Sequence, residues 1–313
     1  MTKSLEDKLE KIPIINLVVK LLKKIKLPGL EGLSIYDLIE LYVIGIAKGA
    51  LTSRASAIAF SFFTAIFPFL LFILIVIPYI PINGFEVEFS DFLESFLPPA
   101  TSEFFFDSIF NNLQSNKQAG FLSSVFILSI LLMANGVNSV FSGFENSYHE
   151  QLTRNVIKQY LYALGVALIL AFLVIITVAV VGYFEIYFIP NFFETLEDKG
   201  LVTTDYSPFW ITVAKYVFYV VMIYLATAVL YYFGTKEGKK SKFFSVGALF
   251  TTLLILLTSY LFGIYIENFS QYNELYGSIG GLLILMLYLW LNSNILLLGF
   301  ELNVSLNKLR SRF

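Results

Sequence analysis

The chain has 313 residues, of which 57% are hydrophobic and only 14% are charged, and its formal net charge is −2. A soluble globular domain carries about 25% charged residues, so this composition is typical of a membrane protein. The absence of cysteine excludes disulfides and thiolate chemistry, and a single histidine, His149, excludes a histidine cluster for zinc, iron or copper. We therefore expect no metal and no other cofactor.

Residues 1–54 predict a cytoplasmic amphipathic segment. The stretch Ile12–Lys26 is basic on one side and apolar on the other, which is typical of a helix in the membrane interface, although a solvated helix packed on the bundle explains it equally well. Ser34–Leu51 carries three charged residues and predicts a second interfacial helix, with Ser34 and Asp37 marking its start. No cleaved leader is expected, because a short apolar core before a small-residue cleavage site is missing.

Six runs are long and apolar enough to cross the roughly 30 Å hydrocarbon core, which takes about 20 helical residues. They are Ser56–Ile80, Phe121–Phe141, Tyr160–Ile189, Phe209–Phe233, Phe243–Ile266 and Tyr276–Val304. Backbone groups stay paired in lipid only in helices or closed barrels, and the lack of period-2 alternation favours helices. The predicted fold is an all-α polytopic membrane protein, with a six-helix domain at 55–306 and a basic cytoplasmic tail at 307–313.

The distribution of Lys and Arg predicts the orientation. With the N-terminus inside, the cytoplasmic segments hold 18 of these residues, against two in the outer loops, Lys117 and Lys199. This is the positive-inside pattern, so both termini are predicted to be cytoplasmic. In the first outer loop, Phe89–Phe96 and Ser102–Leu113 alternate apolar and acidic residues around Pro98-Pro99, which predicts two short amphipathic helices on the outer surface.

Polar residues recur at helical spacing inside three spans, where each is costly in lipid. The candidate site residues are Arg54, Ser61, Thr64 and Pro68 in the first span, Asn135, Asn138, Ser142 and Glu145 in the second, and Tyr288, Asn292, Glu301 and Asn303 in the last. At 100° per residue, the members in each of the first two spans share an arc of about 80°. Pro68 is in mid-span and predicts a local kink or break.

We expect these stripes to face the bundle interior, and two interpretations stay open. Small and polar residues between helices allow close approach and interhelical hydrogen bonds, so the stripes can be packing contacts alone. Alternatively they line a polar cavity for a substrate headgroup. Because Arg54, Asn138, Glu145 and Glu301 lie near the cytoplasmic ends of their spans, such a cavity would open to the cytoplasm.

On the outer side, Glu185 and Lys215 reach similar depths, because the third span runs outward and the fourth runs inward. An ion pair in the outer leaflet is one hypothesis. The alternative, which we favour, is that each side chain extends separately to the headgroups.

Two motifs carry a family resemblance. The first span contains Arg54–Phe60 (RASAIAF) and Phe67-Pro68-Phe69, and the last contains Asn273–Gly281 (NELYGSIGG) and Leu298–Asn303 (LGFELN). With Phe141–Gln159 and Ser245–Tyr265, these motifs resemble the YihY/BrkB family of bacterial inner-membrane proteins over residues 35–306. The resemblance implies a six-helix inner-membrane protein of unsettled function, with relatives linked to serum resistance and to lipopolysaccharide or lipid export.

Older names in this family describe a tRNA-processing ribonuclease. A metal-dependent nuclease needs converging His and carboxylate ligands and a basic surface for phosphates. His149 is alone, and the basic residues flank membrane spans, so we expect neither enzyme activity nor a nucleic-acid partner.

The leading hypothesis is that the chain transports or translocates a lipid or lipid-linked amphipathic substrate in envelope biogenesis. The alternative is a membrane scaffold that organises an envelope complex. No Walker motif is present, so energy for uphill transport would come from a partner or an ion gradient. Membrane lipids are expected partners. The spacings Gly45-xxx-Gly49 and Gly277-xxx-Gly281 permit close contacts within one chain or in a homo-oligomer.

Overall fold

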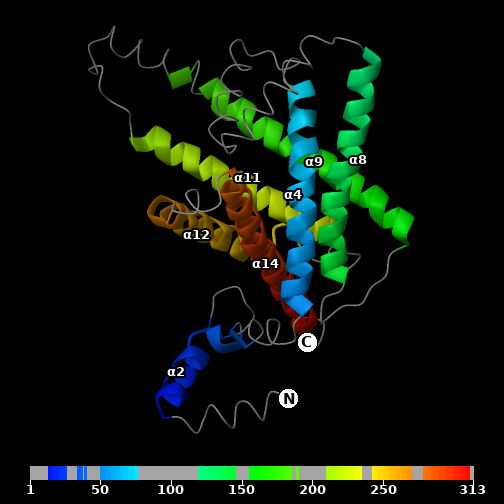
Figure 1. Cartoon of the computed structure of the whole chain (residues 1–313). Coiled ribbons are helices and arrows are strands. Elements are labelled where there is room, and N and C mark those ends of the chain that lie inside the picture. Colours follow the sequence, from blue (N-terminus) through cyan, green and yellow to red (C-terminus); the bar gives the residue numbers. More distant parts are fainter. Residues whose placement is uncertain are drawn as a thin grey trace, which may run out of the picture.

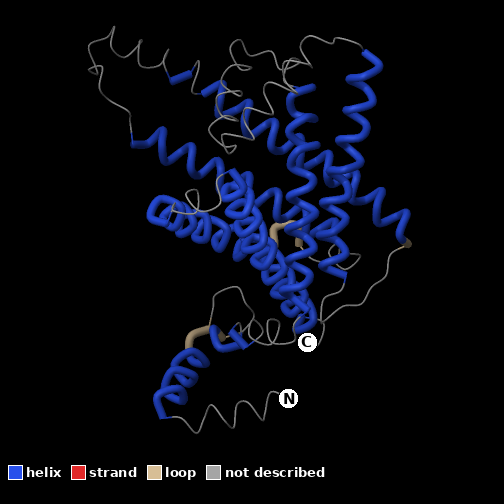
Figure 2. Tube along the Cα trace, in the orientation of Figure 1, coloured by secondary structure: helices blue, strands red, loops and turns tan. Residues whose placement is uncertain are grey.

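The structure is a computed structural model that describes residues 13–26, 34–37, 39–40, 50–76, 119–145, 155–184, 188–189, 209–234, 242–269 and 278–310. Its named helices are α2 (Pro13–Lys24), α4 (Ala50–Val76), α8 (Ala119–Glu145), α9 (Val156–Tyr183), α11 (Phe209–Gly234), α12 (Val246–Phe269) and α14 (Ser278–Arg310). Figure 2 shows these helices in blue and the described loops in tan. The β-pairing of the described residues is limited to an isolated bridge between Lys26 and Ser34.

Six helices, α4, α8, α9, α11, α12 and α14, are long and apolar enough to cross a membrane. Each coincides with one predicted run, so the predicted fold class is confirmed. Helix α4 begins at Ala50, before the predicted Ser56, because a charged residue such as Arg54 ends an apolar run without ending a helix. Helix α4 continues through Pro68 to Val76. Pro68 therefore does not break the helix, and the local kink stays a prediction.

The six helices form a ring. Their contacts follow the order α14, α4, α8, α9, α11, α12 and back to α14. Helices α4 and α8 run side by side, and α9 crosses obliquely behind them (Figure 1). The start of α4 and the ends of α8 and α14 lie towards one end of the bundle, near the C-terminus, which we call the C-terminal end.

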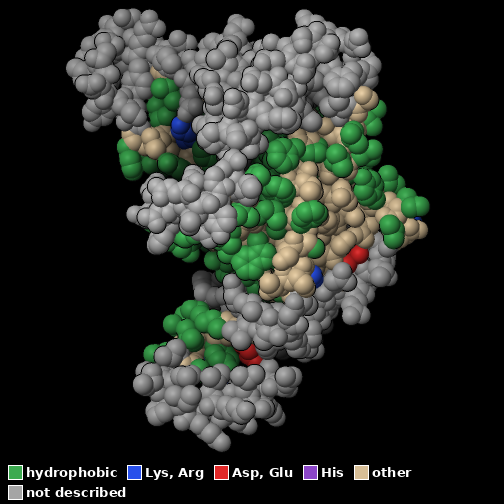
Figure 3. All heavy atoms as spheres, viewed as in Figure 1, with side chains coloured by type: hydrophobic (Ala, Val, Ile, Leu, Met, Phe, Trp, Pro, Cys, Tyr) green, Lys and Arg blue, Asp and Glu red, His purple; other side chains and the backbone are tan. Residues whose placement is uncertain are grey.

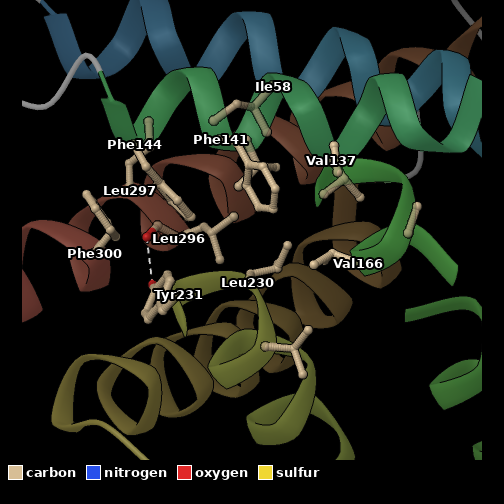
Figure 4. Close-up of a cluster of buried hydrophobic side chains, with 14 of the residues drawn as sticks. Ile58, Val137, Phe141, Phe144, Val166, Leu230, Tyr231, Leu296, Leu297 and Phe300 are labelled. Carbon is tan, nitrogen blue, oxygen red and sulfur yellow. Dashed lines mark hydrogen bonds between the residues drawn. The ribbon is translucent and has the colours of Figure 1, made fainter. Parts of the chain in front are cut away.

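The core of the bundle is apolar and closely packed (Figure 4). Phe141 and Phe144 of α8 are completely buried, and the Phe144 ring stacks on Phe300 of α14 with centroids 4.1 Å apart. Gly234 of α11 makes room for this pair, because a Cβ at this position would lie 2.6 Å from a ring carbon of Phe144. In lipid such van der Waals contacts, rather than exclusion of water, hold helices together.

Large apolar side chains cover much of the outside of the bundle. Examples are Phe172 on α9, Val217 on α11 and Leu257 on α12, all exposed, and green apolar side chains are frequent on the visible surface in Figure 3. A soluble monomer rarely exposes this much contiguous apolar surface. We infer that these exposed apolar side chains contact lipid.

The N-terminal segment is only partly described. Helix α2 confirms the helix predicted within Ile12–Lys26, and it lies apart from the bundle beyond the C-terminal end (Figure 1). The helix start at Ser34 is also confirmed, because the Ser34 backbone N–H donates to Asp37 Oδ2 at 2.7 Å and the Asp37 N–H donates to Ser34 Oγ at 3.3 Å. The rest of Ser34–Leu51 from 41 to 49 lies outside the described residues, as do the predicted outer helices Phe89–Phe96 and Ser102–Leu113.

Candidate functional site

The polar stripe of α8 lies on the outer side of the bundle. The side of α8 that faces the interior is apolar, with Val137, Val140 and Phe141 buried. On the opposite side Asn135 is exposed, and Ser139 is half-buried. The expectation that this stripe faces the interior is therefore wrong for Asn135. The reason is that the large aromatic rings of α8, which fill the core, are on the other side of the helix.

Helix α4 continues this outer polar surface. Its exposed residues follow one helical side, and they are Thr52, Ser53, Ser56, Ala57, Phe60 and Thr64. Thr64, which was also expected in the interior, is on the outside. The space-filling view shows a patch of polar side chains and backbone (tan) among the apolar ones over α4 and α8 (Figure 3). We call the outer side of these two helices, from Ser53 to Thr64 and from Asn135 to Ser142, the polar face.

Small residues bring the two helices of the polar face together. Ser139 Oγ donates to Ser61 Oγ across the seam at 2.7 Å. A Cβ on Gly136 would lie 3.1 Å from Ala65 Cβ, and one on Gly143 would lie 2.8 Å from Ile58 Cδ1. Glycine at these two positions therefore allows α4 and α8 to approach closely enough for the serine pair to form.

Hydroxyl groups on α4 are bonded to their own helix. Ser56 Oγ donates to the Thr52 carbonyl at 3.0 Å, and Thr64 Oγ1 donates to the Ser61 carbonyl at 3.0 Å. A hydroxyl that donates in this way keeps its oxygen lone pairs available as acceptors. The polar face thus presents acceptor oxygens along α4, and the Asn135 amide with both donors and an acceptor on α8.

A buried ion pair closes the C-terminal end of the polar face. Arg54 Nη2 lies 3.2 Å from Glu301 Oε1, and the two side chains are only 11% and 9% exposed. Arg54 Nη1 donates to the Gly143 carbonyl at 2.8 Å, which belongs to the last turn of α8, where carbonyls lack an intrahelical donor. Arg54 therefore connects α4, α8 and α14, and it satisfies a carbonyl at the negative end of the α8 dipole.

The remaining predicted residues of α8, Asn138, Ser142 and Glu145, are only half-buried. Ser142 accepts a hydrogen bond from Gln159 Nε2 of α9 at 3.1 Å. Glu145 is the last residue of the helix. Pro68 of α4, one helical turn beyond Thr64, is buried.

Apart from Glu301, the predicted residues of α14 lie away from the polar face, and Tyr288 and Asn303 contact α12. Tyr288 Oη is 2.7 Å from Ser259 Oγ. Asn303 Oδ1 accepts from the Gly247 N–H, and Asn303 Nδ2 donates to Ser245 Oγ, both at 2.8 Å. Asn292 Nδ2 donates to the Tyr288 carbonyl of its own helix. These contacts are what the packing interpretation predicts, so the candidate set divides into the polar face and a packing interface.

Sequence reasoning missed several polar contacts. Ser139 lies four residues after Asn135, so helical spacing could have found it. Tyr231 of α11 is buried, donates to the Leu296 carbonyl at 2.6 Å and lies 2.6 Å from Thr251 Oγ1. Nothing distinguished this tyrosine in sequence, because it belongs to a run of aromatic residues. Glu185 lies outside the described residues, so neither its pairing with Lys215 nor the favoured separate extension of the two side chains is tested.

Among the described residues, no three His, Cys, Asp or Glu side chains come together as metal ligands. His149 is not among these residues.

A family profile described as Virulence factor BrkB matches residues 45–312. The chain belongs to this family. The resemblance of the first and last spans to the YihY/BrkB family is thereby confirmed, and the chain is a membrane protein of the BrkB family.

Relatives of the chain carry two kinds of name. YfkH of Bacillus subtilis, which is named a ribonuclease-like protein, is 28% identical over 258 residues, covering 82% of this chain and 90% of YfkH. A UPF0761 membrane protein of Aggregatibacter aphrophilus is 22% identical over 270 residues, covering 84% of this chain and 90% of that protein. A shorter match, 32% over 77 residues, is to a UPF0761 membrane protein of Psychrobacter. No solved structure matches the chain.

Proposed function

We propose that this BrkB-family protein moves a lipid or lipid-linked amphipathic molecule between the leaflets of the bacterial inner membrane, in envelope biogenesis. The headgroup passes along the polar face while the acyl chains stay in the bilayer. In this proposal both termini and the C-terminal end of the bundle are cytoplasmic, as the positive-inside pattern predicts.

One observation carries the proposal: polar groups are exposed at membrane depth. Asn135 is ten residues before the end of α8 at Glu145, which corresponds to about 15 Å along the helix. The hydrocarbon core is roughly 30 Å thick, so the exposed polar groups extend from one end to about its middle. The Ser56 and Thr64 hydroxyls are bonded to their own helix, but an amide without a partner in hydrocarbon costs roughly 4–8 kcal/mol. The exposed Asn135 therefore favours contact with water or a polar headgroup over acyl chains.

The proposal includes no enzyme activity. The name ribonuclease-like belongs to YfkH, and nucleic-acid cleavage by a metal-dependent mechanism requires ligands that converge on a metal ion. Two ionic groups at the C-terminal end of the polar face, Arg54 and Glu301, are paired with each other. For a role in hydrolysis, Arg54 or Glu301 would have to leave this ion pair and contact a substrate.

The test uses a matched pair of threonines. Thr64 on the polar face and Thr177 on α9 both donate to a carbonyl of their own helix, at 3.0 and 2.7 Å. Thr64→Val and Thr177→Val therefore remove the same hydroxyl from two places. Purified variants are reconstituted into vesicles that contain a tail-labelled fluorescent lipid, and dithionite added outside bleaches the label as lipid reaches the outer leaflet.

We expect faster bleaching with the wild-type chain than in protein-free vesicles, a slower rate with Thr64→Val, and an unchanged rate with Thr177→Val. Asn135→Leu should slow it further. If the wild-type chain does not accelerate bleaching with any lipid, translocation is wrong, and crosslinking for protein partners would then test the scaffold alternative. Equal rates for the two threonine variants would remove the polar face from the proposal.

A further inference from the structure

We propose that the headgroup accepted by the polar face is an uncharged, hydroxyl-rich sugar, as in a glycosyl diacylglycerol, and not a phosphate. This inference rests on the proposed translocation and specifies its substrate class. Three features of α4 and α8 support it: the pairing of their single cation, Arg54, the hydrogen-bond donors and acceptors along the polar face, and an exposed aromatic ring.

Helices α4 and α8 themselves carry a single cation, and it is already paired. Arg54 is the only Lys or Arg in α4 and α8, and it is already bonded to Glu301 and to the Gly143 carbonyl with its side chain 11% exposed. The other charged residue of these helices, Glu145, is an anion. Phosphate groups are recognised in proteins by Arg or Lys or by free backbone N–H groups. In the middle of a helix such as α4 the backbone N–H groups are used internally, so neither kind of partner is presented here.

The donors and acceptors of the face match a sugar hydroxyl instead. The exposed Ser56 and Thr64 hydroxyls donate to carbonyls of their own helix, so their oxygens are available as acceptors. A phosphate oxygen is also an acceptor, so it forms no hydrogen bond with a hydroxyl oxygen whose proton is already donated to the helix. A sugar hydroxyl donates to such an oxygen and accepts from an amide such as that of Asn135, which makes it complementary to both.

Phe60 supplies a flat apolar surface within the polar face. It lies one helical turn from both Ser56 and Thr64 on α4, and it is 61% exposed. The face of an aromatic ring is electron-rich and attracts positively polarised hydrogens. The C–H face of a sugar ring fits this surface, and the hydroxyls around it reach the neighbouring polar groups. A phosphate group has no comparable apolar face.

The experiment compares headgroups on identical tails. Vesicles with the reconstituted full chain receive one of three tail-labelled lipids: glucosyl diacylglycerol, phosphatidylglycerol or phosphatidylcholine. We expect the glucolipid to cross at least about ten-fold faster than either phospholipid, which is the discrimination that a hydrogen-bonding site gives against a ligand that lacks its groups. Equal rates for all three lipids, or a faster phospholipid, would overturn the sugar assignment and leave translocation standing. No acceleration of any lipid would overturn translocation itself.

A second comparison localises the selectivity. Phe60→Leu removes the ring and keeps an apolar side chain, and Phe172→Leu does the same at a 56% exposed position on α9, away from the polar face. We expect Phe60→Leu to reduce the glucolipid rate several-fold and leave the phospholipid rates unchanged, whereas Phe172→Leu changes none of them. Both variants must match the wild type in size-exclusion profile and thermal midpoint. A properly folded Phe60→Leu variant that retains the full glucolipid preference would contradict the assignment.

Discussion

Arg54 and Glu301 are 247 residues apart in sequence, and their side chains form an ion pair of 3.2 Å at the C-terminal end of the bundle. The pair joins the first membrane helix to the last, and the Gly143 carbonyl brings the second membrane helix into the same contact. Three helices that are consecutive neighbours in the ring, α14, α4 and α8, therefore meet at one guanidinium group.

Removal of one member of this pair should destabilise the protein more than removal of both. Glu301→Gln leaves the Arg54 charge buried without its partner, a change that costs about 3–5 kcal/mol. The double variant Arg54→Met with Glu301→Met should be more stable than Glu301→Gln. Thermal unfolding in detergent measures this, with Lys158→Gln at the exposed start of α9 as a control. A double variant that is less stable than Glu301→Gln would contradict the coupling of the two charges.

Gly299 should not tolerate a side chain. A Cβ at this position would lie 2.6 Å from Tyr231 Oη and 2.8 Å from the Gly247 carbonyl oxygen, with Thr251 Oγ1 closer still. Gly299→Ala therefore forces α11 and α12 away from α14, and we expect loss of the folded protein from the membrane fraction. Gly165→Ala on α9 is the control, because a Cβ there meets no atom within 4 Å. That variant should gain up to about 1 kcal/mol of helix stability. Equal expression of the two would argue against the close α12–α14 contact.

Asn303 should contribute to stability through α12. Asn303→Leu keeps the approximate volume but removes the acceptor for the Gly247 N–H and the donor to Ser245 Oγ. Loss of buried partners of this kind costs about 1–3 kcal/mol. Asn294→Leu is the matched control on the same helix, because within the described part of the chain its amide donates to the Trp290 carbonyl of α14 itself. Unfolding in increasing sodium dodecyl sulfate should show a lower midpoint for Asn303→Leu than for Asn294→Leu, and the reverse order would be inconsistent with the contact.

Tyr231 should stabilise the contact between α11 and α14 through its hydroxyl. Tyr231→Phe retains the ring against Phe144 and Phe300 but loses the bonds to the Leu296 carbonyl and Thr251. We expect a loss of about 1 kcal/mol, seen as a lower unfolding midpoint. Tyr260→Phe, at an exposed position on α12, should have no effect. An unchanged midpoint for Tyr231→Phe would mean that its hydrogen bonds make no net contribution.

The sequence by itself determined the number, type and approximate positions of the membrane helices. This is possible because lipid accepts only segments whose backbone groups are paired internally, so each spanning helix must be a long apolar run. It also determined which polar residues share one side of a helix, since the helical period is constant. For this reason Asn135, Asn138, Ser142 and Glu145 share one arc of α8.

Only the tertiary structure decided which side of each helix faces the bundle interior and which side faces outward. A helix has the same period whether a given side meets another helix or lipid, so sequence could not place Asn135 and Thr64 on the outside. Nor could it pair Arg54 with Glu301 or Tyr231 with Leu296, since these contacts depend on the order of helices around the ring and on how closely they approach. That approach is set by glycines such as Gly136 and Gly299, whose missing side chains matter only once a particular neighbour lies against them.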